Sequence, residues 1–145
     1  MLQGLFGNGA MVEGWAVYGE RMMLESGYGG NTPEMWLMYS KWNLRVVTNT
    51  ILDYNVHVLG MTEPQAMDLL MRQAFQTRSQ ATEKWHRVKV SSVQLTSYFS
   101  GYSEIMDLRE QRKQAMGANF VLKDFHEQFL SFGSAPVKTI RELMQ

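Results

Sequence analysis

The chain has 145 residues, of which 45% are hydrophobic and 19% charged, so it can build a globular core and is not disordered. Its formal net charge is zero, which argues against nucleic acid as the main partner, because no basic excess is present to hold a phosphate backbone. Cysteine is absent, which excludes disulfides, cysteine zinc sites and thiol catalysis. No stretch is apolar and long enough to cross a bilayer, so no membrane span is expected.

The first predicted helix covers residues 11–25 and is ended by Gly27. At about 100° per residue, Glu13 and Glu20 fall on the same side as Val17 and Leu24, so two carboxylates lie along an apolar stripe. A carboxylate in that position must be paired, protonated or bound to a metal, because burying it alone is costly. Two interpretations stay open, a salt bridge to an arginine and a ligand site.

Two glycines, Gly14 and Gly19, lie inside this helix, where each costs about 1 kcal/mol relative to alanine. We expect them to let another element approach the helix backbone closely.

The second predicted helix is long, from residue 33 to about residue 59, with Thr32 as its cap and Gly60 at its end. One face is apolar, and so is the opposite face, which predicts a helix that is buried on both sides. The residues of the first face are Leu44, Val47, Ile51, Tyr54 and Val58, and those of the second are Met35, Tyr39, Trp42 and Val46.

A file of polar residues, Arg45, Asn49, Asp53 and His57, runs along the same helix at a spacing of four residues. In one interpretation it is an internal ladder, in which Asp53 holds His57 and Asn49 bridges to Arg45. In the other it is the wall of a site, in which Asp53 orients the His57 imidazole toward a ligand. The spacing alone does not decide between them.

Further helices are expected over residues 62–76, 80–90, 92–116, 122–132 and 136–144, and no segment shows the period of a strand. The fold class is therefore all-α, a multi-helix bundle packed around the first, second and fifth helices. Phe125, Phe129 and Leu130 are predicted core residues. His86 is expected on a solvated face, and His126 is expected to be structural.

Taken alone, the chain contains no complete catalytic set, because it has no HExxH segment, no nucleophile elbow and no phosphate-binding loop. It offers parts of a site. These are a carboxylate on an apolar helix face (Glu13), an Asp–His pair one turn apart (Asp53 and His57) and a tyrosine on a core-facing helix (Tyr98).

Those parts stand in the order seen in a known family. Residues 13–20 match an EGWA-x-Y-x-E signature, and further matching segments follow at residues 53–60, 62–66, 94–101, 108–109, 124–127 and 133–136. The chain resembles the bacterial domain-of-unknown-function family 885, whose members are large α-helical proteins related to zinc metallopeptidases of the gluzincin type. The resemblance covers nearly the whole chain.

The resemblance implies that residues 1–145 are a single all-α domain or fragment, the C-terminal part of a larger gluzincin-like metallopeptidase fold. Family members carry an upstream HExxH-like segment with two zinc-binding histidines and the general base. That N-terminal half is absent from this sequence, so we expect a truncated product or a fragment. Any signal sequence would lie in the absent part, which leaves open whether this bacterial protein is cytoplasmic or exported.

Carried over by resemblance, Glu13 would be the third protein ligand of zinc in a site that leaves its fourth position to water. His57 and Tyr98 would donate hydrogen bonds to the oxyanion formed at a peptide carbonyl, and Asp53 would hold the His57 tautomer. Glu20 would be a further carboxylate on the zinc side. The expected cofactor of the full-length protein is thus zinc and the expected substrate a peptide.

The sequence departs from the family around the proposed oxyanion side. Asn55 stands where members have a glycine before the histidine of the long helix, Ser92-Val93 replaces Pro-Gly, and Val88 replaces a tyrosine. These changes affect the start of the helix that carries Tyr98 and therefore the direction in which the Tyr98 hydroxyl points.

Two functional interpretations follow. In the first, the chain is the C-terminal fragment of a zinc-dependent peptidase, inactive alone because it holds zinc weakly or not at all. In the second, it is a non-catalytic helical module that binds a partner or itself. If a missing half normally covers the face with Glu13, Val17, Trp42 and Tyr98, the fragment exposes an apolar patch there and is expected to self-associate.

Overall fold

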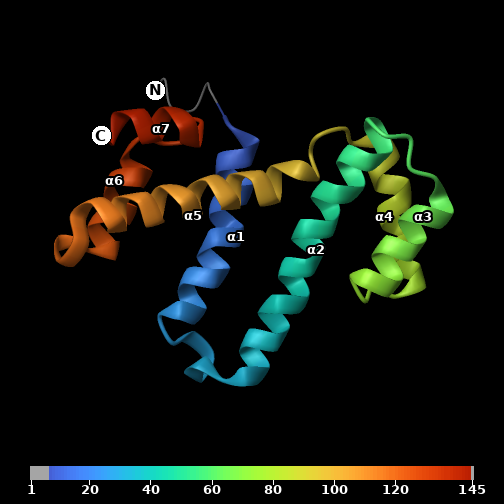
Figure 1. Cartoon of the computed structure of the whole chain (residues 1–145), viewed down its shortest axis with the longest axis horizontal. Coiled ribbons are helices and arrows are strands. Elements are labelled where there is room, and N and C mark those ends of the chain that lie inside the picture. Colours follow the sequence, from blue (N-terminus) through green and yellow to red (C-terminus); the bar gives the residue numbers. More distant parts are fainter. Residues whose placement is uncertain (1–6, 145) are drawn as a thin grey trace.

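The structure is a computed structural model that describes residues 7–144, and these residues form seven α-helices and no strand, which confirms the all-α prediction. Figure 1 shows their order. The helices are α1 (Gly9–Glu25), α2 (Pro33–His57), α3 (Glu63–Asp68), α4 (Arg78–Val90), α5 (Thr96–Met116), α6 (Leu122–Ser131) and α7 (Val137–Leu143). Among the described residues, no helix is both apolar and long enough to pass through a membrane.

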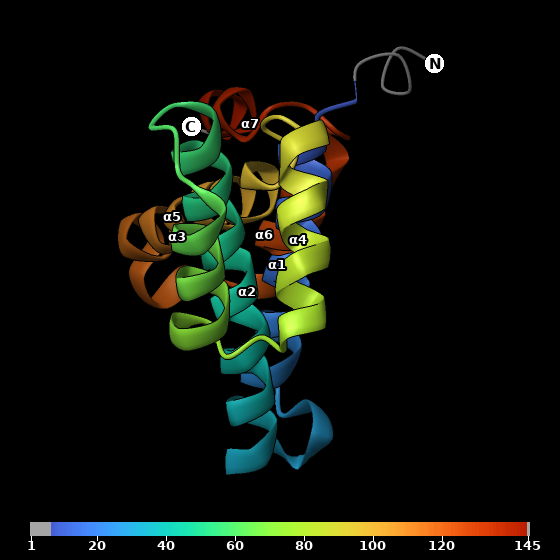
Figure 2. The same ribbon diagram turned by 90° about the vertical axis from the view of Figure 1, so that its right-hand side faces the viewer.

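The helices gather around two hydrophobic cores. α1 crosses α5, and α6 and α7 lie at the far end of α5, whereas α2 runs beside α3 and α4 (Figures 1 and 2). The first core joins α1, α5, α6 and α7 through residues that include Tyr18, Ile105, Phe129 and Ile140. The second joins α2, α3 and α4 through residues that include Leu52, Ala66, Ala81 and Val88. The start of α5 connects the two.

The crossing of α1 and α5 depends on a pair of glycines. A Cβ built on Gly14 would overlap the backbone of Gly101, and a Cβ built on Gly101 would overlap the carbonyl of Ala10. The two helix backbones are therefore in direct contact, as the sequence predicted for Gly14. The prediction for Gly19 is wrong, because a Cβ there would meet no atom within 4 Å.

Side-chain caps set several of the helix starts. The Met11 N–H donates to Asn8 Oδ1 at 2.8 Å at the start of α1, and Thr77 and Gln80 form a reciprocal capping box at the start of α4. Two predicted helices are shorter than expected. α3 passes into a π-turn at Leu69–Gln73, and α5 begins at Thr96 because Val93 has φ 68°, which no helix residue adopts.

Burial corrects two expectations drawn from apolar periodicity. α2 is not buried on both sides within the described residues, since residues of its first predicted face such as Tyr54 (55% exposed) and Val58 (61% exposed) face solvent. Trp42 of the second predicted face is also open to solvent (53% exposed). Leu130 is 45% exposed and does not belong to the core, whereas Phe125 and Phe129 do. α6 is amphipathic, and only one of its faces meets α1 and α5.

Candidate functional site

Asp53 is the most tightly held of the predicted site residues. It is 2% exposed, and its Oδ1 accepts the Val93 N–H at 3.2 Å while its Oδ2 accepts the Thr96 N–H and the Thr96 hydroxyl, both at 3.0 Å. Leu95, at the cap position of α5, has no side chain that can fill this role. Asp53 of α2 therefore caps α5 from outside that helix, where a negative charge also complements the helix dipole.

His57 lies one turn after Asp53 on the same side of α2, and its ring contacts Asp53 and the end of α4. Its Nε2 is 2.9 Å from the Val88 carbonyl oxygen and 3.4 Å from Asp53 Oδ1. Because a carbonyl only accepts, Nε2 must carry the proton, and the Nδ1 of a neutral ring can then only accept. To donate to an oxyanion, His57 would have to be protonated or leave Val88.

A cleft of about 370 Å³ opens beside this pair, between the end of α2 and the start of α5. Its lining is mostly apolar, with the Asp53–His57 pair at one wall. The lining residues are Thr50, Asp53, Tyr54, His57, Val58, Ser92, Val93 and Thr96. Asp53 and His57 thus line a cleft, as the site-wall interpretation requires, and their orientation toward a ligand stays a prediction. Tyr98 and Glu13 do not line this cleft.

Tyr98 lies on the first turn of α5, half-buried against the α1–α5 core. The Gln94 Nε2 donates to its hydroxyl at 3.1 Å, and Gln94 Oε1 in turn accepts from Arg87 at 2.8 Å. The tyrosine oxygen thus acts as an acceptor, which leaves its own proton free to be donated. That geometry is compatible with the hydrogen-bond donor predicted for this position.

Glu13 lies on α1, directly before the glycine that contacts α5, and is half-buried. Within residues 7–144 its carboxylate has neither an ion-pair partner nor a hydrogen-bond donor. The helix contact at Gly14 holds its backbone rigidly, and Tyr98 is three residues before Gly101 on the facing helix. Glu13 on α1 and Tyr98 on α5 therefore each lie within one helical turn of the place where the two helices cross.

Glu20, the second carboxylate of the α1 stripe, borders a different hollow. It faces a cleft of about 510 Å³ between α1 and α2, whose lining is dominated by methionine and aromatic side chains such as Met38, Tyr39 and Trp42. Burial raises the pKa of Glu20 above its usual value. The structure does not place Glu20 beside the Asp53–His57 cleft.

The glutamate that pairs with arginine is Glu25, at the end of α1. It accepts from Arg21 Nε and from Arg109, both at 2.8 Å, and these two cations hold the pKa of Glu25 below its usual value against the opposing effect of burial. The salt bridge considered for Glu13 and Glu20 is therefore made by a residue that the helical pattern did not single out.

The polar file on α2 is not a continuous ladder. Arg45 stacks over the Trp42 ring, with its guanidinium carbon 4.6 Å from the ring centroid, and does not bond Asn49. The Asn49 Oδ1 is buried without a hydrogen-bond partner. Only the Asp53–His57 half of the predicted ladder is present.

The two remaining histidines lie where the sequence placed them. His86 is exposed on α4. His126 Nε2 is 2.7 Å from the Tyr18 hydroxyl, and Trp15 packs edge-on against its ring, so His126 belongs to the α1–α6 interface. Burial and the nearby Arg109 lower the pKa of His126.

The sequence did not reveal the partners of Asp53. Thr96 and Val93 were expected inside a helix that began at residue 92, where a backbone N–H has no need of a cap from another helix. The signal that could have located them is the absence of a Ser, Thr, Asp or Asn cap directly before Thr96.

The positions of the His, Asp and Glu side chains bear on whether this chain could bind zinc by itself. Within residues 7–144, no three His, Asp or Glu side chains lie close enough together to hold a metal ion. Glu13 is available as a single ligand, so a His₂Glu site would need both of its histidines from outside the described residues.

Comparisons with known proteins place this geometry in context. A family model described as a bacterial protein of unknown function, DUF885, matches residues 1–144. A solved structure from Shewanella oneidensis, described as a "putative lipoprotein of unknown function", is 69% identical with a TM-score of 0.93, and the match covers 97% of this chain and 26% of that one. The chain thus spans about a quarter of the length of that relative. No curated protein matches the sequence.

Proposed function

The chain belongs to the DUF885 family of bacterial proteins of unknown function. From the resemblance of its motifs to zinc metallopeptidases and from the setting of Glu13, we propose that it works as one part of a larger zinc-dependent peptidase. In that protein, Glu13 supplies one of three zinc ligands, and the other two come from polypeptide outside this chain. Zinc would supply a water nucleophile of lowered pKa for the hydrolysis of a peptide bond. The substrate is a peptide, and the isolated chain is inactive.

The observation that supports this proposal is the Glu13 carboxylate on a rigid helix crossing, which has no hydrogen-bond or ion-pair partner among the described residues. A half-buried glutamate normally has an arginine, lysine or backbone partner, because its desolvation is otherwise uncompensated. Glu13 has none among residues 7–144, although Arg21 and Arg109 of the same core are both used by Glu25. A metal ion that is bound jointly with another segment would supply the missing charge.

Tyr98 fits the same proposal as a hydrogen-bond donor near the reacting carbonyl, because its proton is free and it shares the crossing with Glu13. Asp53 and His57 have only an indirect part in this proposal. The bonds of Asp53 to Thr96 fix the start of α5, and Tyr98 follows two residues later. His57 would reach a substrate only from the neighbouring cleft.

The test uses a chimera in which this chain replaces the matching segment of the Shewanella protein, a replacement that 69% identity and a TM-score of 0.93 make compatible with that fold. Zinc content and hydrolysis of a peptide library are measured for the chimera, for Glu13→Gln and for Glu104→Gln, an exposed α5 control. Losing the partner of a zinc ligand costs about 10–100-fold in affinity, so losing the ligand itself should cost at least that. Equal zinc retention in both variants would refute the role of Glu13.

A second candidate function, a non-catalytic helical module that binds itself or a partner, is favoured by a separate observation. Asp53, His57 and Tyr98 all make hydrogen bonds inside the chain, as members of a structural network would. The face proposed for self-association is only partly exposed, since Val17 is buried while Trp42 is open to solvent. Sedimentation of the isolated chain at several concentrations would show whether it associates.

A further inference from the structure

An apolar stripe runs along the outward side of α2 and is only partly covered within the described residues. This outer stripe consists of Leu44, Val47, Ile51, Tyr54 and Val58. Tyr54 is 55% exposed and Val58 is 61% exposed. The spacing alternates between three and four residues and repeats every seven, which is the pattern of a helix that packs lengthwise against another helix.

On α2 itself the flanks of the outer stripe carry no charge, although Asp68 of α3 lines the same hollow as Ile51. The charged residues of this part of α2 are Arg45 and Asp53, and they point toward α4 and α5 respectively. The flanking residues Asn43, Thr50 and Asn55 are uncharged. A helix pair on a protein surface usually has charged flanks, whereas a helix without them is typical of a protein interior.

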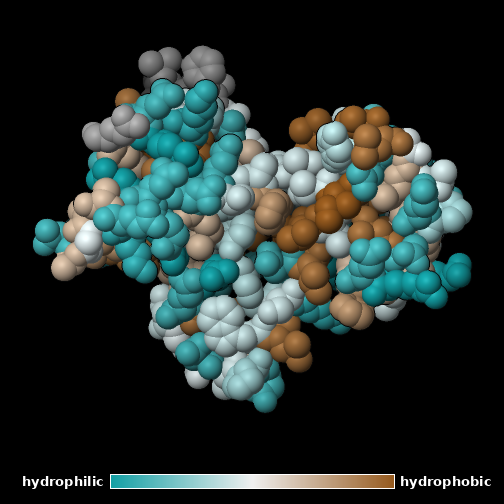
Figure 3. Space-filling view, in the orientation of Figure 1, coloured by the Kyte–Doolittle hydropathy of each residue, from teal (hydrophilic) through white to brown (hydrophobic). Residues whose placement is uncertain are grey.

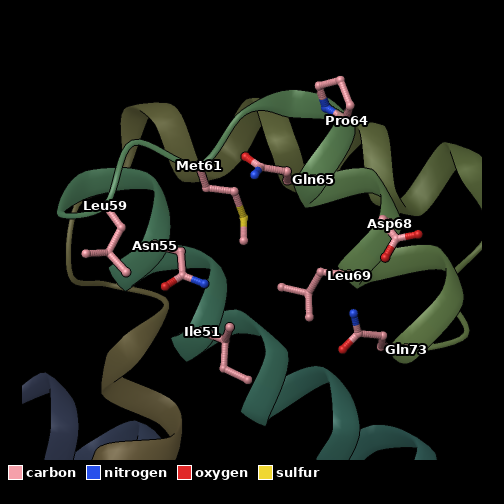
Figure 4. A pocket seen from close by; sticks show the side chains of 9 residues that line it. All are labelled: Ile51, Asn55, Leu59, Met61, Pro64, Gln65, Asp68, Leu69 and Gln73. Atoms are coloured by element: carbon pink, nitrogen blue, oxygen red, sulfur yellow. The ribbon is translucent and has the colours of Figure 1, made fainter.

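A groove continues the outer stripe on the side of α3. It has a volume of about 740 Å³, and Figure 4 shows Met61 and Leu69 pointing into the hollow that Ile51 and Asn55 border. In Figure 3 hydrophobic surface gathers along the upper half of α2 next to this groove. The outer stripe spans fifteen residues, or about 21 Å at 1.5 Å per residue, which gives room for about four turns of a docked helix.

We infer that the outer stripe is the binding surface for an α-helix. This helix would belong to the polypeptide that longer relatives have outside the segment matched here. The Shewanella structure keeps this fold at a TM-score of 0.93 while the match covers only 26% of its chain, so about three quarters of that chain lies outside the matched segment and is available to pack against it. A seven-residue apolar repeat with uncharged flanks on α2, beside a largely apolar groove, is a surface of this chain that such polypeptide would cover. This inference rests on the proposed function only in taking the chain to work within a longer protein.

The docked helix would also close the cleft of His57. Tyr54 and Val58 belong both to the outer stripe and to the lining of that cleft, so a helix seated on them forms its roof. The Asp53–His57 pair would then be shut off from bulk water by polypeptide outside this chain.

The test uses thiol accessibility, because this chain has no cysteine of its own, so a single substitution gives one reporter thiol in the isolated chain. In the chimera, the reaction of the unsubstituted chimera is subtracted as background. Ile51→Cys and Val58→Cys report on the outer stripe, and Val90→Cys, at a position that is 85% exposed at the end of α4, is the matched control. Maleimide reaction rates are compared in the isolated chain at low micromolar concentration and in the chimera. Far-UV circular dichroism verifies folding, and if the chimera does not fold, the same substitutions are made at the aligned positions of the Shewanella protein.

In the isolated chain all three thiols should react quickly. In the chimera the two stripe thiols should slow by roughly tenfold or more while the control thiol does not, since only the stripe is covered. Stripe thiols that remain as reactive as the control in the chimera would overturn the inference. So would stripe thiols that are already shielded in the isolated chain and gain no protection in the chimera, because the occupant would then be a second copy. Neither readout depends on zinc, so a chimera that shields the stripe but holds no metal would contradict the proposed function alone.

Discussion

The role of Asp53 as the cap of α5 leads to a quantitative prediction. Asp53→Ala removes an acceptor that holds the N–H and hydroxyl of Thr96 and the N–H of Val93, at a position that is only 2% exposed. Loss of a cap costs about 1 kcal/mol. Each buried donor left unpaired costs about 1 kcal/mol or more. We therefore expect the free energy of unfolding to fall by about 2–4 kcal/mol, with a drop of about 6–12 °C in Tm for a domain of this size.

The measurement is urea and thermal unfolding of the isolated chain, followed by circular dichroism. Thr96→Val removes only the hydroxyl bond to Asp53 Oδ2, so it should cost about 1 kcal/mol. Asp68→Ala is the control, because the Asp68–Arg72 pair is exposed and should contribute less than about 0.5 kcal/mol. If Asp53→Ala destabilises the chain no more than Asp68→Ala does, the capping role is refuted, and the bonds seen for Asp53 contribute no net stability.

Three further predictions concern packing and charge. Gly14→Ala should destabilise the chain strongly because its Cβ overlaps the facing helix, whereas Gly19→Ala should be neutral or stabilising by up to about 1 kcal/mol; thermal melts of both variants decide this. The pKa of His126 is lower in the folded chain than in the unfolded chain, so unfolding takes up a proton. The contribution of His126 to the free energy of unfolding should therefore be complete above about pH 6.5 and be lost as the pH falls below it. Urea titrations at several pH values should show that His126→Gln reduces the dependence of the free energy of unfolding on pH. Glu25→Gln should cost about 1–3 kcal/mol in the same titrations, because it leaves Arg109 largely buried without its full counter-charge, and a loss below 0.5 kcal/mol would contradict that account.

The sequence by itself determined the elements of the fold. Apolar spacing of 3.6 residues predicts the helices of an all-α chain, and caps such as Thr32 and Thr77 mark where helices begin, because both signals are local properties of the backbone. The family was also visible in the sequence, since the order of motifs around Glu13 and Tyr98 does not depend on the folded arrangement. Its relation to zinc peptidases stays a prediction.

Tertiary structure decided which partner each polar group has. Asp53 was expected to serve His57, but its main bonds go to Thr96 and Val93, which lie about forty residues further along the chain. Helical periodicity cannot show this, because it describes one helix at a time. The same limit explains α2, where two apolar faces predicted burial on both sides. Periodicity identifies a face that avoids water, but only packing shows what covers it, and among residues 7–144 the outer stripe is covered only in part.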